Sequence, residues 1–494
     1  MNKLNILENI NIGSRVAEEE RDNLNKYFIE TNEYKRTLKD EVDIIYGAKG
    51  TGKSALYLSI LKNYKKLNDD ENIIVIQAES MQEASAFKSV VEDPPTSENT
   101  FRNIWKLYFL VLLYENFVSK YIFNRNYIRQ VLFDSKLLGK DRSLMEVFSD
   151  AYRYIKNNSI NSVEAKMSLD TNTGIPNGIS GKITFSDTVD GINKGSVNID
   201  KLFDSINNLL AKKKKRAWLM LDRLDSVFEG NDTLEENAIR GLFKAYLDMK
   251  KFSLIREKIF LRTDIWDKIT KKGFREASHI TRTANIEWTE QSIINLIVKR
   301  FTENEFITRE YGIEKEKIIS DYKNQENLFY KIFPEQVEKS EKKPVTIKWI
   351  ITRTSDAKGI IAPREIIHLI IEMVALQVTY LKMGKDNTEA GNLFERSLFK
   401  LALDKVSTVK IEQTLFAEYP DMKEYIQKFI QQKATNSLES IIRIIGKSKD
   451  KSTEIIDRLI EIGFFTKTQT DGKAFYNIPF LYRPYLNSIQ GKSE

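Results

Sequence analysis

A glycine-rich loop near the amino terminus constrains this sequence more than any other feature. The loop, Gly47-Ala48-Lys49-Gly50-Thr51-Gly52-Lys53-Ser54, satisfies the phosphate-loop pattern. Its glycines let backbone N–H groups encircle a phosphate, and the helix that follows adds the positive end of its dipole. The β-branched run 42–46 before the loop indicates a strand, and the run 54–64 indicates a helix. The sequence therefore predicts a nucleotide-binding site here, and an ordinary glycine turn is the weaker alternative.

The fixed residues of the loop have predicted roles in binding ATP and Mg²⁺. Lys53 would neutralise the β- and γ-phosphates, which also makes it a catalytic residue, and Ser54 would place its hydroxyl on Mg²⁺. The predicted nucleotide-contacting residues are Gly47, Ala48, Lys49, Gly50, Thr51, Gly52, Lys53, Ser54 and Ala55. ATP and Mg²⁺ are the predicted cofactors.

A second motif supplies the carboxylates that such a site needs. The apolar run 217–221 ends in Asp222, which is predicted to hold Mg²⁺ through water. Asp225 is the predicted catalytic base that orients the attacking water, and Glu229 is a weaker candidate. An ordinary acidic turn is the alternative interpretation. Arg223 is unusual, because ring-type ATPases usually have glutamate directly after the strand aspartate.

Two arginines are predicted to sense the γ-phosphate. Arg262 ends a short strand, 258–261, that in an ATPase sheet would lie between the two nucleotide-binding strands. Arg364 follows Pro363 at the start of a helix, from which it could reach back to phosphate when domains close. Either arginine could instead be a surface ion-pair partner.

The order of elements predicts an α/β core followed by helical domains. Further strands are predicted at 73–77 and 284–288, and helical pattern separates the strands, which favours a parallel sheet with helices on both faces. With 494 residues the chain should form two to four domains. The predicted divisions are an ATPase core over 1–288, with a helical insertion at about 79–158 and a polar hairpin or loop at about 159–198, a helical lid over 289–405 and a winged helix over 406–494.

The predicted winged helix has helices at 437–445 and 452–462, a turn at Asp471-Gly472 and a strand at 474–478. Between residues 450 and 462 there are four acidic and two basic side chains, whereas a helix that faces phosphates would be basic. This favours a protein contact. Nucleic acid is not the favoured partner, although Lys467, Lys473 or the run 212–216 could touch its backbone.

Composition excludes several classes of site. The chain has no cysteine, which excludes disulfides, thiolate metal sites and cysteine nucleophiles, and its two histidines exclude a histidine-rich metal site. The most apolar window, 104–114, is too short for a membrane span and is predicted as a buried helix. No signal peptide is recognised, so a cytoplasmic location is expected.

Six segments together resemble a family of bacterial P-loop ATPases that is similar to the AAA+ and STAND classes. The segments are 13–20, 27–31, 47–56, 221–225, 259–264 and 478–483. The resemblance implies an ATPase core, a helical lid and a winged helix, and it places relatives in phage defence. Arg223 and the lack of sensor repeats after the winged helix depart from STAND proteins.

The leading functional hypothesis is an ATP-hydrolysing switch or assembly ATPase in antiviral defence, acting as a homo-oligomer with a separate effector protein. The alternative is a DNA-acting ATPase that resembles replication initiators or helicase loaders. A nucleotide-bound scaffold with little turnover is the third hypothesis.

Overall fold

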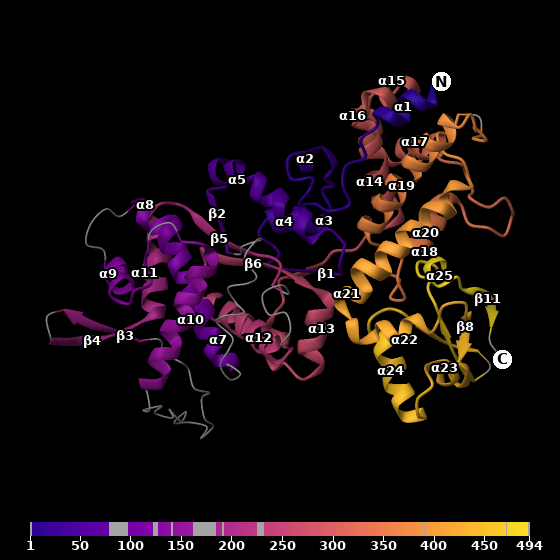
Figure 1. The fold of residues 1–494 in the computed structure, drawn as a ribbon. Coiled ribbons are helices and arrows are strands. Elements are labelled where there is room, and N and C mark those ends of the chain that lie inside the picture. The colour runs from indigo at the N-terminus through magenta and orange to yellow at the C-terminus, as the bar shows by residue number, and fades with distance from the viewer. Residues whose placement is uncertain are drawn as a thin grey trace. The chain divides into compact units, whose positions relative to one another are not determined.

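The structure is a computed structural model that describes residues 2–78, 97–121, 127–139, 142–161, 184–189, 192–224, 232–389, 391–470 and 472–492. The chain divides into two compact units, each considered by itself (Figure 1). The sheet unit comprises Asn32–Gly47 and Leu56–Ile286, and the C-terminal unit comprises Met1–Thr31, Ala48–Ala55 and Glu287–Glu494.

The sheet unit is built on five strands in which every neighbouring pair is parallel. They are β1 (Ile44–Gly47), β2 (Ile73–Gln77), β5 (Arg216–Leu221), β6 (Ile255–Arg262) and β7 (Thr283–Asn285). Their order across the sheet is β2-β5-β6-β1-β7. The predicted α/β fold class, a P-loop NTPase sheet, is confirmed. The last strand is shorter than predicted, because β7 ends at Asn285 instead of residue 288.

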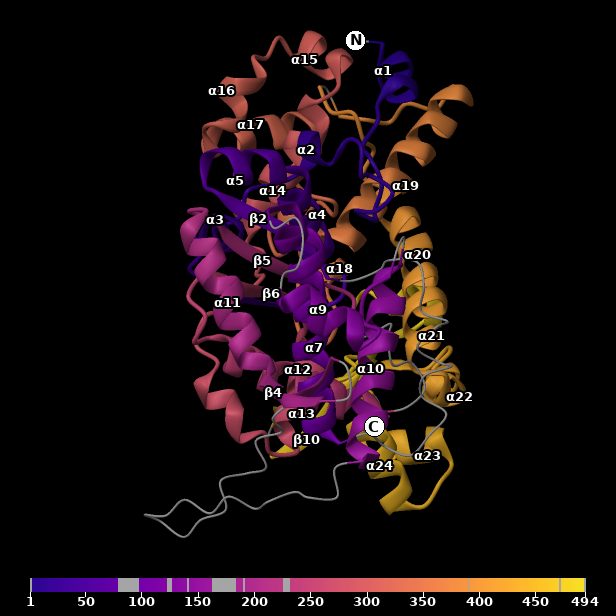
Figure 2. The ribbon, with the colours of Figure 1, turned by 90° about the vertical axis from the view of Figure 1, so that its left-hand side faces the viewer.

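Helices cover the sheet, and α7 (Glu98–Leu113) is the predicted buried helix. It packs against α12 (Asp232–Met249), as Figure 2 shows. Gly241 of α12 permits the close approach, because a Cβ there would lie 2.5 Å from Phe101 Cβ. The charge of Lys106, which the apolar helix buries, is balanced by Asp200 at 2.7 Å.

The remaining elements of the sheet unit include a two-stranded antiparallel hairpin of residues 184–189 and 192–198, which lie within the segment predicted as a polar hairpin or loop. Residues 162–183 and 190–191 of that prediction, and 79–96 of the predicted helical insertion, lie outside the described residues. The remaining described elements of the sheet unit, in chain order, are α3 (Asn32–Leu38), α4 (Lys53–Lys62), α5 (Tyr64–Asp70), η1 (Tyr114–Val118), α8 (Ser119–Tyr121), α9 (Tyr127–Asp134), α10 (Leu144–Asn161), β3 (Thr184–Val189), β4 (Ile192–Asn198), α11 (Ile199–Lys212), α13 (Thr263–Lys271) and η2 (Arg275–His279).

The C-terminal unit is mainly helical, as the spacing of its apolar residues predicted. Its helices before the terminal domain are α1 (Lys3–Asn9), α2 (Leu24–Tyr27), α14 (Glu290–Thr302), α15 (Glu305–Tyr311), α16 (Lys315–Ile319), α17 (Tyr322–Ile332), α18 (Thr346–Thr354), α19 (Pro363–Lys382), α20 (Leu398–Lys410), η3 (Ile411–Leu415), α21 (Phe416–Glu418), η4 (Pro420–Met422) and α22 (Lys423–Gln427). The predicted boundary after residue 405 lies inside α20, and the three-domain division stays a prediction. Among the described residues, none of the helices is both long enough and apolar enough to span a membrane.

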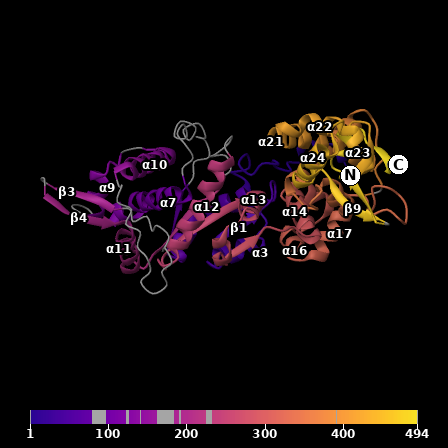
Figure 3. The same ribbon diagram turned by 90° about the horizontal axis from the view of Figure 1, so that it is seen from below.

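The terminal elements follow the order of a winged helix, with two helices after a first strand and then a hairpin. They are β8 (Lys433–Ser437), α23 (Leu438–Ile445), α24 (Lys449–Glu461), β9 (Thr466–Thr470), β10 (Lys473–Asn477), α25 (Arg483–Leu486) and β11 (Ile489–Lys492) (Figure 3). The sheet order is β11-β8-β10-β9, and β11 was not predicted. Ile456 and Leu459 of α24 are buried in the core of the C-terminal unit.

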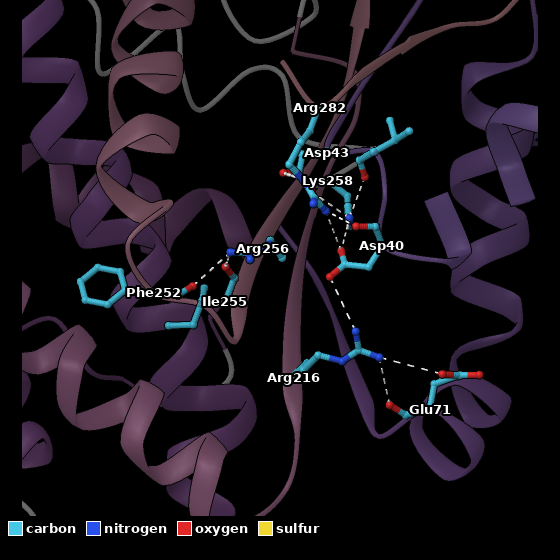
Figure 4. Close-up of polar contacts among 10 residues, drawn as sticks. Asp40, Asp43, Glu71, Arg216, Phe252, Ile255, Arg256, Lys258 and Arg282 are labelled. Atoms are coloured by element: carbon cyan, nitrogen blue, oxygen red, sulfur yellow. Dashed lines mark hydrogen bonds and ion pairs between the residues drawn. The ribbon is translucent and has the colours of Figure 1, made fainter. Parts of the chain in front are cut away.

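A buried charge network lies at the start of β1, beside the middle of β6 (Figure 4). Lys258 is fully buried, and its Nζ donates to Asp40 Oδ1 at 2.6 Å, to Val42 O at 2.7 Å and to Asp43 Oδ1 at 2.9 Å. Arg282 Nε donates to Asp43 Oδ2 at 2.7 Å. All three protons of the ammonium therefore have acceptors, which fixes the start of β1.

Glu257, next to Lys258 on β6, should make stability depend on pH. It is 1% exposed, and burial together with the charge of Asp43 raises its pKa to about 8. An unfolded glutamate has a pKa near 4.3, so the folded state binds the proton more tightly. The stabilisation from this proton is complete below about pH 4.3 and is lost, at up to about 1.4 kcal/mol per pH unit, as the pH rises through about 8.

Glu257→Gln cannot ionise, so we expect its free energy of unfolding to rise relative to wild type between about pH 5.5 and about pH 8.5, measured by urea denaturation. Glu424→Gln, which removes an exposed carboxylate, is the matched control. A constant difference between Glu257→Gln and wild type across this range would contradict the prediction.

Candidate nucleotide-binding site

The phosphate loop begins where β1 ends and leads directly into α4. Gly50 and Gly52 have φ of +84° and +102°, conformations that side-chain-bearing residues rarely adopt, so glycine is required at both. Thr51 Oγ1 donates to Ala48 O at 2.8 Å, which closes the loop on itself. Lys53 Nζ donates to the same carbonyl at 3.0 Å. These contacts hold the loop closed, and the ammonium predicted to meet phosphate lies beside it. Ser54 and Ala55 follow in the first turn of α4.

The amino end of α19 lies against this loop within the C-terminal unit. A Cβ built on Gly50 would be 3.2 Å from Arg364 Cβ and 3.3 Å from Glu365 Oε2. Pro363 is the first residue of the helix, as predicted, so Arg364 is in its first turn. Arg364 Nε is buried and has no hydrogen-bond partner among the described residues. The structure therefore brings together the loop and the arginine that the sequence proposed as a phosphate sensor.

Two further contacts to the loop were missed by sequence reasoning. Trp288 Nε1 donates to Thr51 O at 2.8 Å. Lys49 forms an ion pair with Glu418, the last residue of α21. Both contacts join residues far apart in the chain, and neither leaves a local sequence signal. They connect the loop to the residues just before α14 and to the end of α21.

The carboxyl edge of the sheet contains Asp222 and Arg262. Strand β6 lies between β1 and β5, as predicted, and Arg262 is the register partner of Gly47. Asp222 directly follows β5 and is 3% exposed. Arg223 has φ of +54°, so the chain turns sharply after Asp222 in a conformation uncommon for arginine. Asp225 and Glu229, the two candidate bases, lie outside the described residues.

Arg262 takes part in a bidentate ion pair in the sheet unit. Its Nε donates to Asp264 Oδ1 at 3.0 Å and its Nη2 to Asp264 Oδ2 at 2.7 Å. This is the ion-pair arrangement that the sequence left open. A sensor role for Arg262, which would require it to exchange Asp264 for phosphate, stays a prediction.

The amino-terminal segment of the resemblance packs into the C-terminal unit. Arg300 of α14 donates to Glu20 Oε1 at 2.6 Å, and both side chains are buried. Arg15 Nη1 lies 3.5 Å from His368 Nδ1 on α19, one turn after Arg364. Burial, and then the charge of Arg15, lower the pKa of His368. The amino-terminal segment therefore packs against α19, the helix whose first turn contacts the phosphate loop.

Each unit contains an oxygen donor of the kind that Mg²⁺ takes. Magnesium prefers oxygen ligands and is usually held by one or two carboxylates together with substrate phosphates. Asp222 of the sheet unit carries a carboxylate, and Ser54 of the C-terminal unit carries a hydroxyl. In the part of the chain that the structure describes, no group of three or more histidines, aspartates or glutamates is placed to hold a metal ion.

Comparison with known proteins gives one curated relative and several solved structures. No protein-family model matches the chain. The protein named "Putative transposon gamma-delta 80.3 kDa protein" from Escherichia coli K12 is 24% identical over 328 residues, which cover 65% of this chain. The match covers 43% of that relative, so the chain spans less than half of its length.

Two solved proteins illustrate the structural comparison. The ORC2 protein of Aeropyrum pernix, in complexes with ADPNP and ADP, has a TM-score of 0.40 and 10% identity over 93% of both chains. The Cdc6p protein of Pyrobaculum aerophilum has a TM-score of 0.29 and 9% identity over 98% of this chain and 96% of that one.

Proposed function

We propose that this protein binds ATP with Mg²⁺ and hydrolyses it as a molecular switch. The observation that supports this most is the phosphate loop itself, with two positive-φ glycines and with Arg364 at its surface. A phosphate bound in the loop would replace Ala48 O as the acceptor of the Lys53 ammonium. It would also contact the Arg364 guanidinium. Because catalysis of phosphoryl transfer is mostly positioning and charge stabilisation, these cations are the groups it needs.

The switch would act through the contacts that the loop makes within the C-terminal unit. Lys49 is paired with Glu418, and Gly50 packs against the first turn of α19. A γ-phosphate would compete with Glu418 for the ammonium of Lys49. Binding and hydrolysis would therefore alter contacts of the lid and of the segment before the winged helix.

Asp222→Asn tests the assignment of Mg²⁺-dependent chemistry. The variant should lose at least about 100-fold in the rate of hydrolysis, because the carboxylate that holds the metal becomes neutral, while ATP binding without Mg²⁺ is kept. Phosphate release and calorimetry measure the two effects. Asp267→Asn, at an exposed position of α13, is the control and should hydrolyse ATP like wild type. Hydrolysis at the wild-type rate in Asp222→Asn would remove Asp222 from the site.

The catalytic base is proposed to be Asp225. Asp225→Asn should slow hydrolysis with Mg²⁺ binding kept, and undiminished hydrolysis would transfer the role to Glu229 or to another residue. The homo-oligomer, the separate effector protein and the antiviral setting stay predictions from the sequence. A DNA-acting ATPase is the second candidate function, and a pair of arginines beside the winged helix favours it.

A further inference from the structure

Two arginines of the C-terminal unit form a stack with aromatic rings beside the base of the winged-helix hairpin. Arg353 of α18 has its guanidinium carbon 4.8 Å from the Trp349 ring centroid and 4.5 Å from that of Phe480. The guanidinium carbon of Arg483 lies 4.0 Å from the Phe480 ring centroid. Both cations therefore lie close to the same ring, which is 39% exposed. Stacking fixes a guanidinium by its face and leaves its N–H edges available.

Neither arginine of the stack has a carboxylate partner among the described residues. Arg353 Nη1 donates to Thr352 Oγ1 at 2.9 Å, and Arg483 Nε donates to Ile478 O at 2.8 Å, both neutral acceptors. Glu338, whose charge acts on Arg353, already pairs with two lysines, Lys343 at 2.9 Å and Lys400 at 2.6 Å. Two half-buried like charges thus lie together without a direct carboxylate partner among the described residues.

Burial opposes these charges. It lowers the pKa of both guanidinium groups, and the charge of Arg353 lowers that of Arg483 further. By contrast, other half-buried arginines of the same unit, such as Arg396 and Arg458, each pair with a glutamate at 2.8 Å and 2.7 Å. An arrangement that keeps two fixed cations unpaired favours an external anion with oxygen acceptors.

We propose that Arg353 and Arg483 bind backbone phosphates of a nucleic acid, with Phe480 holding the two guanidinium groups in place. Two adjacent fixed cations suit a polymer with regularly spaced phosphates, and guanidinium edges match phosphate oxygens in a bidentate manner. This inference rests on the second candidate function, a DNA-acting ATPase, and it names the surface that would contact the nucleic acid.

The recognition-helix position of the winged helix is a poorer surface for phosphate. Helix α24 has an excess of acidic residues, and its Arg458 is occupied by Glu461 and lies over the Tyr419 ring at 5.3 Å. Its apolar side, including Ile456, is buried in the core. The geometry therefore favours a contact through the stack and not through α24.

The test compares the binding of a fluorescent 20-base-pair duplex and of its single strand to the full chain and to Arg353→Gln/Arg483→Gln, at about 50 mM and about 200 mM salt. The double variant should lose roughly ten-fold in duplex affinity at the lower salt. Its slope of log affinity against log salt should be shallower by nearly two units, since each duplex phosphate contact contributes about 0.9.

Two variants separate a specific contact from general charge. Arg443→Gln/Arg458→Gln removes the same charge from α23 and α24 and should leave the affinity and the salt slope close to wild type. Arg353→Lys/Arg483→Lys keeps the charge but loses the planar guanidinium groups that stack on Phe480. It should bind the duplex with an affinity between those of wild type and the glutamine variant. Equal losses in the stack and control variants, or an unchanged salt slope in the stack variant, would overturn the proposal.

Inorganic phosphate distinguishes a free anion from a nucleic acid. The proposal expects about 10 mM phosphate to compete only as its ionic strength does. Phosphate that binds wild type in calorimetry, together with duplex binding that the stack variant leaves intact, would assign the site to free phosphate and overturn the proposal. If the double variant does not fold, hydrogen exchange of wild type should still show duplex-induced protection in 478–486. ATP affinity of the wild type is measured in parallel. Absence of ATP binding would contradict the ATPase proposal, whereas the duplex titrations test only the role of Arg353 and Arg483.

Discussion

Lys53→Ala should weaken ATP binding by roughly 10- to 100-fold, because the variant loses a charge-assisted contact to the terminal phosphates. The fold should persist, since Lys53 Nζ donates to Ala48 O, a contact at the surface of the loop that water can replace. Isothermal calorimetry with ATP measures the affinity, and circular dichroism checks the fold.

Lys65→Ala is the matched control, because it removes the same kind of side chain from an exposed position of α5, outside the loop. Its loss should leave ATP affinity close to wild type. Wild-type affinity in Lys53→Ala, or an equal loss in both variants, would show that Lys53 does not neutralise the phosphates.

The parts of the site that the sequence predicted are those with a local pattern. Glycines at fixed spacing after a β-branched run predict a phosphate loop, and Asp222 follows its own apolar strand. Arg364 could be proposed because proline marks the first turn of its helix. These inferences needed only neighbouring residues.

The parts that the sequence did not predict depend on contacts between distant segments. Trp288 and Glu418 reach the loop from positions more than 200 residues away, and no periodicity marks them. Lys258 appeared to be the polar start of a strand at 258–261, whereas β6 begins at Ile255 and buries Lys258 completely. Tertiary pairing of charges overrode the usual preference of lysine for the surface.

Lys258→Met should destabilise the sheet unit by about 3–5 kcal/mol, because it leaves the buried carboxylate of Asp43 and the nearby carboxylate of Asp40 with too little positive charge. Methionine keeps most of the volume, so the loss reports the charge and not a cavity. Urea denaturation, with hydrogen exchange of β1 and β6 as the local measurement, gives the change.

Lys251→Met is the control for this prediction. Lys251 also pairs with an aspartate, Asp200 at 2.8 Å, but its side chain is 51% exposed, so its loss should cost at most about 1 kcal/mol. Equal losses in the two variants would contradict a special role for the buried ammonium.

A rescue variant keeps the prediction testable even if Lys258→Met does not fold. Asp40→Asn in the Lys258→Met background removes one of the two carboxylates, and Arg282, 2.7 Å from Asp43 Oδ2, can then balance the other. We therefore expect the double variant to recover much of the lost stability, whereas Asp200→Asn in the same background should recover none. Recovery by Asp40→Asn would locate the cost in the uncompensated charge at the start of β1, the strand that delivers Gly47 to the phosphate loop. A double variant no more stable than Lys258→Met would instead attribute the loss to lost packing over the Trp218 ring, 4.6 Å from Lys258 Nζ.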